Sequence, residues 1–247
     1  MSYFKLDNVS LDYIVRTGSN SLKTTCFKLT QKLFCNNKDN LLHSSYRALS
    51  NINLDIKNGT RLALIGRNGS GKSSLLKVLA QIYKPTIGKI STQGNISTLF
   101  NINIGLSEES TGYENIILMA IMRGYKKNEM TSLIKDVENF TELGKFLHYP
   151  VRTYSAGMRV KLSFAISTAV STDIMLIDEI IGVGDNHFIH KAKNRIKNTL
   201  QKSDIIVLAS HSNDILQEFC NVGLILDKGR VLFYGDIKDA IYKYKKL

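Results

Sequence analysis

Apolar positions along this chain fall into short runs with two different spacings. Residues 3–15 are typical of a strand, and residues 48–56 alternate apolar and polar side chains, as half-buried strands do. Residues 61–66, 173–178 and 204–210 are nearly continuous apolar runs, which are typical of strands buried on both faces of a parallel sheet. Strands separated by helical stretches predict an α/β fold.

Helical spacing dominates one block between these strands. The pattern from Thr111 to Glu114 is that of a capping box, which predicts the start of a helix, and helical periodicity returns over residues 128–147. We therefore expect a helical subdomain over about residues 101–170, inserted between two parts of the sheet.

The remaining apolar pattern predicts further β-structure. Strand-like pieces occupy about residues 89–100, and residues 222–235 predict a hairpin that turns at Lys228 and Gly229. A basic helix is expected at the C-terminal end of the sequence. These strands, with residues 3–15, form the antiparallel subdomain and complete the sheet of one α/β domain over residues 1–247.

Charge and composition narrow the class of protein. The 247 residues are 43% hydrophobic, as in an ordinary globular protein, and 33 Lys and Arg against 21 Asp and Glu leave a net charge of +12. This excess favours an anionic partner such as nucleic acid, an acidic lipid surface or phosphates, although solubility alone is an alternative. We expect a cytoplasmic protein, since the three cysteines form no CxxC pair and no signal peptide or membrane-spanning segment is evident.

One segment stands apart in composition. Residues 16–47 carry six Lys and Arg against a single Asp, with Leu22, Cys26, Leu29 and Leu33 at helical spacing. This pattern predicts a basic amphipathic insertion. It either packs on the domain or contacts a membrane or a partner.

The strongest chemical signal is "GRNGSGKS", which matches G-x-x-x-x-G-K-[ST] between a predicted strand and a predicted helix. Glycines let backbone N–H groups cradle phosphates, Lys72 is expected to reach the β- and γ-phosphates, and Ser73 is expected to ligate Mg²⁺. The candidate ATP-binding residues of this loop are Gly66, Arg67, Asn68, Gly69, Ser70, Gly71, Lys72, Ser73 and Ser74.

Two further strand ends carry polar side chains. Asp178 and Glu179 follow the apolar run "IMLI", where Asp178 is expected to hold Mg²⁺ and Glu179 to polarise the attacking water. His211 follows the run "IIVLAS" and is expected to contact the γ-phosphate. Lys72, Glu179 and His211 are therefore the candidate catalytic residues.

The stretch "TYSAGMRVKL" opens a predicted helix with the small residues Ser155, Ala156 and Gly157, 23 residues before Asp178 when counted from Ser155. With the phosphate loop and His211, this order resembles the ATP-binding subunits of ABC transporters. The resemblance implies a P-loop NTPase core of ABC type that binds ATP and Mg²⁺. It also implies a homodimer in which Ser155, Ala156, Gly157 and Met158 contact the nucleotide held by the other subunit.

Other family positions are implied one at a time. Asp185 matches the acid of the D-loop, and Asn101 lies nearest the position of the Q-loop glutamine, where it could also ligate Mg²⁺. Tyr13 best matches the aromatic residue that stacks on adenine, and Tyr46 is a rival for that role.

The stretches at residues 97–118, 152–158 and 178–185 resemble the polysaccharide-export branch of the family, and most of all the short O-antigen exporter subunit. This implies ATP-driven export of a lipid-linked polysaccharide through a separate polytopic membrane permease. The subunit would then lie at the cytoplasmic face of the inner membrane, with no nucleic acid as partner. Alternatives are a capsule or teichoic-acid exporter and, less favoured, a soluble ABC ATPase that acts on ribosomes or DNA.

Overall fold

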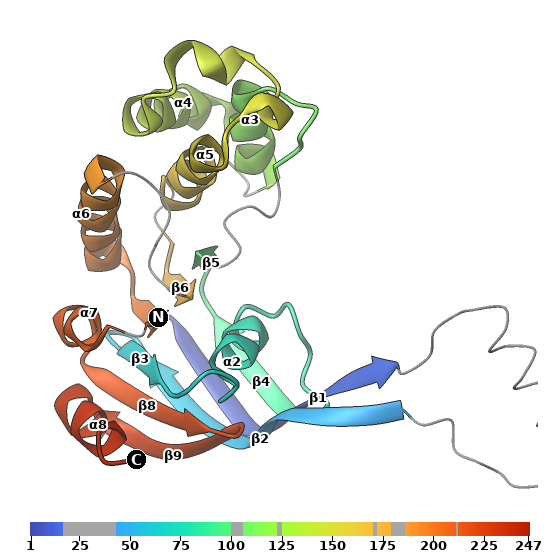
Figure 1. Ribbon diagram of the computed structural model, residues 1–247, viewed down its shortest axis with the longest axis vertical. Coiled ribbons are helices and arrows are strands. Elements are labelled where there is room, and N and C mark those ends of the chain that lie inside the picture. Colours follow the sequence, from blue (N-terminus) through green and yellow to red (C-terminus); the bar gives the residue numbers. More distant parts are fainter. Residues whose placement is uncertain (17–42, 100–105, 123–124, 170–171, 179–185, 211) are drawn as a thin grey trace, which may run out of the picture.

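The computed structural model describes residues 1–16, 43–99, 106–122, 125–169, 172–178, 186–210 and 212–247. Figure 1 shows two sheets at one end of the molecule and a group of helices, α3 to α5, at the other. This arrangement confirms the expected α/β fold with an antiparallel sheet beside the main one.

The smaller sheet is antiparallel, with strand order β2-β1-β4. Its strands are β1 (Tyr3–Arg16), β2 (His43–Lys57) and β4 (Ile87–Gln93). Burial alternates from Tyr3 to Leu6, as in a half-buried strand, but Val9, Ser10 and Leu11 are all buried where the β1–β2 register shifts. The strands take in Arg16 and residues 43–47, the two ends of the range expected as a basic insertion; the predicted helix within that range lies outside the described residues.

The larger sheet has the order β5-β6-β7-β3-β8-β9, in which only β9 runs antiparallel to its neighbour. The strands are β3 (Arg61–Ile65), β5 (Ile96–Leu99), β6 (Ile174–Asp178), β7 (Ile205–Ala209), β8 (Val222–Asp227) and β9 (Arg230–Asp236). Lys228 and Gly229 both have positive φ at the β8–β9 turn, which is the backbone of a two-residue hairpin turn.

Helices flank the larger sheet. Helix α2 (Lys72–Leu79) packs against β2, β6 and β7, whereas α8 (Ile237–Tyr244) packs against β3, β8 and β9. The other two are α6 (Asn186–Lys202), which contacts α5, and α7 (Asn213–Phe219), which contacts α8.

The helical group is inserted between β5 and β6, as the sequence predicts. It contains α3 (Gly112–Met122), α4 (Lys127–Thr141), the 3-10 turns η1 (Gly144–His148) and η2 (Val151–Thr153), and α5 (Ala156–Thr168). The periodic stretch 128–147 is not one helix. Helix α4 ends at Thr141 because Glu142 and Gly144 both take positive φ, and the chain continues as η1.

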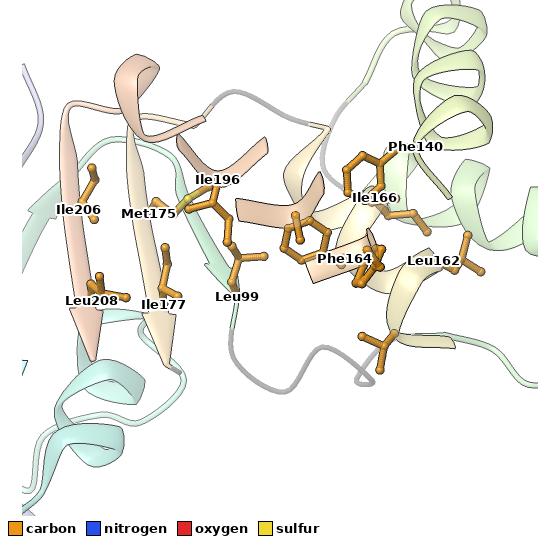
Figure 2. Packing of buried hydrophobic residues seen from close by; sticks show 14 of the residues in the cluster. Leu99, Phe140, Leu162, Phe164, Ile166, Met175, Ile177, Ile196, Ile206 and Leu208 are labelled. Atoms are coloured by element: carbon orange, nitrogen blue, oxygen red, sulfur yellow. The ribbon is translucent and has the colours of Figure 1, made fainter. Parts of the chain in front are cut away.

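The two faces of the larger sheet bury separate hydrophobic cores. Leu62 and Leu64 face a core shared with the antiparallel sheet and α2, while Ala63 and Ile65 face a core shared with the helical group. Figure 2 follows the second core from Ile206 and Met175 on the sheet to Phe164 on α5. One continuous core thus holds the helical group against the sheet.

Candidate nucleotide-binding site

The phosphate loop joins β3 to α2 at the carboxyl edge of the parallel strands, where ligands of such sheets bind. Two of its glycines are enclosed by backbone. A Cβ on Gly66 would lie 2.4 Å from the carbonyl oxygen of Leu226, and a Cβ on Gly71, whose φ is +107°, would lie 2.9 Å from that of Ala48. Any side chain at these positions would displace the loop.

Gly69 differs from these two glycines. A Cβ there would meet no atom of the described residues within 4 Å, but its φ of +79° is one that other residues rarely adopt. The hydroxyl of the neighbouring Ser70 is buried and has no hydrogen-bond partner among the described residues. The backbone at Gly69 is therefore exposed, while Gly66, Ser70 and Gly71 beneath it are closely packed. A loop that approaches an anion requires this arrangement.

Lys72 and Ser73 open α2 immediately after the loop. The Lys72 ammonium donates to the carbonyl oxygens of Gly66, at 2.6 Å, and Arg67, at 3.1 Å, so it lies over the loop. Ser73 is exposed in the first turn of the helix. A phosphate bound here would meet the Lys72 charge and the amino-terminal end of α2 together.

Asp178 ends β6 at the same edge of the sheet. Only β7 separates β6 from β3, and α2 packs against β6. The described residues contain no group of three or more His, Cys, Asp and Glu that could hold a metal alone. A hydroxyl, one carboxylate and the phosphates of a nucleotide are the ligand set that Mg²⁺ uses in nucleotide sites, so the residues present fit that ion.

Several predicted residues cannot be placed against this geometry. Asn101, Glu179, Asp185 and His211 lie outside the described residues. His211 follows β7 and Glu179 follows β6 in the sequence.

The two candidate adenine-stacking residues are cross-strand partners in the β1–β2 ladder. The Tyr13 hydroxyl lies 3.0 Å from Ser74 Oγ, and the Tyr13 ring makes an edge contact with Tyr83 at 5.6 Å between centroids. Tyr46 is 56% exposed. Tyr13 is therefore bonded to the helix after the phosphate loop, while Tyr46 presents an open ring beside it.

Ser155, the residue before α5, is the N-cap of that helix, and its Oγ accepts a hydrogen bond from the Met158 N–H at 3.3 Å. Ser155 and Ala156 are exposed. Among the described residues, a Cβ on Gly157 would meet only Ser155 Oγ, at 4.0 Å, so no packing within that part of the chain requires a glycine there. Figure 1 places α5 in the helical group and α2 on the sheet.

The β8–β9 turn and β2 support the phosphate loop, a role that sequence reasoning missed. The Gly229 N–H donates to the Ser70 carbonyl oxygen at 2.9 Å, and the Gly229 carbonyl accepts from the Ser50 N–H at 2.8 Å. A Cβ on Gly229 would lie 2.4 Å from the Ala48 carbonyl oxygen. The sequence pattern indicates only a hairpin turn, because nothing in it links Gly229 to a loop so far away in the chain.

The chain is similar in sequence to known proteins. Residues 49–182 match the family model described as ABC transporter. The chain is 41% identical over 194 residues to the O-antigen export system ATP-binding protein RfbE of Yersinia enterocolitica, which covers 78% of this chain and 80% of RfbE. It is 38% identical to RfbB of Myxococcus xanthus, another O-antigen export system ATP-binding protein, over 81% of this chain and 46% of that protein.

A third relative is the teichoic acids export ATP-binding protein TagH of Shouchella clausii, 35% identical over 97% of this chain and 64% of TagH. Among solved structures, an ATP-binding subunit of an ABC transporter superposes with a TM-score of 0.72 at 20% identity, over 98% of this chain and 93% of that one. The ATP-binding cassette MJ0796, solved as a dimer bound to ADP and Pi, gives 0.69 at 20% identity, over 95% and 98%. These structures share the fold.

Proposed function

The chain belongs to the ABC transporter family, and on this premise we propose that it is the ATP-binding and ATP-hydrolysing subunit of an exporter of lipid-linked polysaccharide. The observation that carries ATP binding is the phosphate loop, in which Gly66 and Gly71 leave no room for side chains and Lys72 lies over the backbone. The named activity of RfbE supports the polysaccharide as substrate.

The residues of the candidate site have separate roles in the proposed reaction. Backbone N–H groups and Lys72 bind the phosphates, while Ser73 and Asp178 hold Mg²⁺, which neutralises phosphate charge when bound. Glu179 positions the attacking water and His211 contacts the γ-phosphate. Both roles follow from the positions of these residues after parallel strands of the sheet.

A homodimer completes the proposed site. Within the described ranges, Gly157 has neither a close packing contact nor a positive φ that would explain it, although glycine in a helix costs up to about 1 kcal/mol relative to alanine. Space at Gly157 and the exposed Ser155 suits an anion that arrives from outside the chain. In our proposal this anion is the γ-phosphate of the ATP held by the second subunit, and the D-loop residue Asp185 crosses the same interface.

A membrane subunit is the proposed second partner. No helix in the described part of the chain is both long enough and apolar enough to cross a bilayer. Helix α3 exposes the apolar side chains of Ile117, Leu118, Ile121 and Met122. Neighbouring exposed apolar side chains of this kind mark interaction surfaces. We place the permease on this face of α3, with the subunit at the cytoplasmic face of the inner membrane.

Co-purification tests the partner and the substrate class together. Wild-type protein should retain a polytopic membrane protein, and deletion of its gene should remove a surface polysaccharide. Recovery of ribosomes or DNA in place of a membrane protein would contradict the proposal.

One pair of variants tests the docking face. Ile121→Glu places a charge on the exposed face of α3, where Ile121 is 60% exposed, and should release the permease. Leu232→Glu on β9, where Leu232 is 52% exposed, is the matched control and should retain it. Equal retention by both variants would exclude α3 as the docking face.

A further inference from the structure

The segment that leads into α3 lies along the segment that leads into α5. The Arg152 N–H donates to the Glu108 carbonyl oxygen at 2.9 Å, and the Val151 N–H donates to that of Ser110 at 3.0 Å. An isolated β-bridge joins Thr111 to Pro150. The two segments therefore lie side by side, although about 40 residues separate them in the sequence.

Asn115 ties the first of these segments to α3. Its side chain is fully buried, and Oδ1 accepts from the Ser107 N–H at 2.7 Å. Its Nδ2 lies within hydrogen-bond distance of the carbonyl oxygens of Ser107, Ser110 and Thr111, at 3.0, 3.2 and 2.9 Å. Because all four bonds converge on one buried side chain, residues 107–111 form one unit with the start of α3.

The start of α3 also abuts the residue before the α5 N-cap. A Cβ on Gly112 would lie 2.5 Å from the Tyr154 hydroxyl oxygen, so only glycine allows this approach. The hydroxyl donates to the Phe146 carbonyl oxygen at 2.7 Å, and burial raises the pKa of Tyr154, which keeps the proton on the oxygen. The Tyr154 hydroxyl is thus held between Gly112 of α3 and the carbonyl oxygen of Phe146.

One ion pair joins residues 107–111 to α5. The Arg159 guanidinium bonds Glu108 Oε1 at 2.8 Å through Nη1 and the Arg152 carbonyl oxygen at 3.1 Å through Nη2. Beside the contact lies a pocket of about 360 Å³. Its lining residues are Leu106, Glu108, Val151, Tyr154, Ala156 and Arg159. Because of this space, the first turn of α5 is less tightly packed than the rest of the helix. The contact between Arg159 and Glu108 therefore sets the position of that turn.

We infer that Glu108, through Arg159, is a positioning residue that transmits occupancy of the α3 docking face to the first turn of α5. The inference rests on the proposed function, because it requires a membrane subunit on α3 and a nucleotide facing Ser155 and Gly157. In this inference, the Glu108–Arg159 ion pair links the membrane subunit on α3 to the nucleotide that faces α5.

The test compares Glu108→Gln with Glu109→Gln in the complete complex with the membrane subunit. The two variants each remove one carboxylate charge, at adjacent positions, but the Glu109 carboxylate contacts Arg152 Nε at the longer distance of 3.6 Å. Three quantities are measured: basal ATPase of the isolated subunit, affinity for the membrane subunit, and stimulation of ATPase by that subunit. Glu108→Gln should lower stimulation about two- to fivefold, the effect of a partly exposed ion pair, and leave the other two unchanged. Glu109→Gln should match wild type.

Wild-type stimulation in Glu108→Gln, with the membrane subunit bound, would overturn the inference and leave the proposed function standing. Failure of the wild-type chain to bind any membrane subunit would overturn both. Charge reversal adds a second criterion: Glu108→Arg with Arg159→Glu should regain stimulation that Glu108→Arg loses. No recovery in the double variant would overturn the ion pair as the link.

Amide hydrogen exchange separates transmission from a structural role. In the wild-type complex, binding of the membrane subunit should change exchange at residues 155–159. In Glu108→Gln this response should be lost while exchange in α3 still responds. An unchanged response at residues 155–159 would overturn the inference.

Discussion

The hydroxyl of Tyr13 lies 3.0 Å from Ser74 Oγ, so the antiparallel sheet is bonded directly to the helix that follows the phosphate loop. Tyr13 is also the cross-strand partner of Tyr46. The sheet therefore presents a tyrosine pair beside the loop, in which one member is anchored and the other exposed.

We predict that the exposed member contributes more to base binding. Tyr46→Ala should weaken ATP binding about tenfold and leave inorganic triphosphate binding unchanged, because stacking on a base contributes about 1–3 kcal/mol. Tyr13→Phe removes only the bond to Ser74 and should leave the preference for ATP over triphosphate intact. Calorimetric titration with both ligands measures this preference. An unchanged preference in Tyr46→Ala, together with its loss in Tyr13→Ala, would assign the stacking role to Tyr13.

Two glycine substitutions should have opposite effects on folding. Gly157→Ala should maintain the stability of the monomer or raise it by up to about 1 kcal/mol, because alanine favours helix and the space around its Cβ is open. ATPase activity and ATP-dependent dimerisation should nevertheless fall. Gly66→Ala should destabilise the chain by about 1–3 kcal/mol, because its Cβ would clash with backbone.

Urea unfolding measures the stability of both variants, and light scattering with ATP measures dimerisation of Gly157→Ala. Full activity and normal dimerisation in Gly157→Ala would contradict a nucleotide contact at Gly157.

Glu179→Gln should retain ATP binding and lose turnover by at least about a hundredfold, because the amide cannot act as a general base. ATP should then accumulate a closed dimer, detectable by size-exclusion chromatography. Lys72→Ala is the control, since it should weaken nucleotide binding itself. Normal turnover in Glu179→Gln would assign the role to another residue.

The α3 capping box should make stability depend on pH. The Thr111 N–H and hydroxyl donate to the Glu114 carboxylate at 2.8 and 3.0 Å, and the backbone bond lowers the pKa of Glu114 most. Since the folded pKa is below the unfolded one, this stabilisation is complete above the unfolded pKa and is lost as pH falls through the folded pKa. Between pH 7 and about pH 3, the urea midpoint of wild type should fall further than that of Glu114→Gln. Parallel pH profiles would contradict this.

Cys220 should be inert in the folded protein. Burial raises its thiol pKa to about 12, so the reactive thiolate is scarce at neutral pH. With Cys26 and Cys35 replaced by serine, a chromogenic thiol reagent should react with the remaining thiol only after denaturant is added. Rapid stoichiometric reaction of the native variant would show that Cys220 is accessible.

Local patterns in the sequence carried much of this structure. The continuous apolar runs at residues 61–66, 173–178 and 204–210 correspond to β3, β6 and β7, since strands covered on both faces need no polar side. The Thr111–Glu114 pattern opens α3 because a capping box is satisfied within four residues. The phosphate-loop motif is a run of adjacent residues, and Lys72 bonds the backbone of that same loop, although Gly66 and Gly71 approach the distant residues Leu226 and Ala48.

Contacts between segments that are distant in the sequence could be identified only in the folded chain. Gly229 holds the phosphate loop through Ser70, Gly112 meets Tyr154, and Tyr13 rather than Tyr46 is bonded to Ser74. None of these leaves a periodic signal, because each depends on how two elements approach in space. Hydrophobic spacing specifies which side of an element is buried, whereas the partner that covers it is selected by packing of the whole domain.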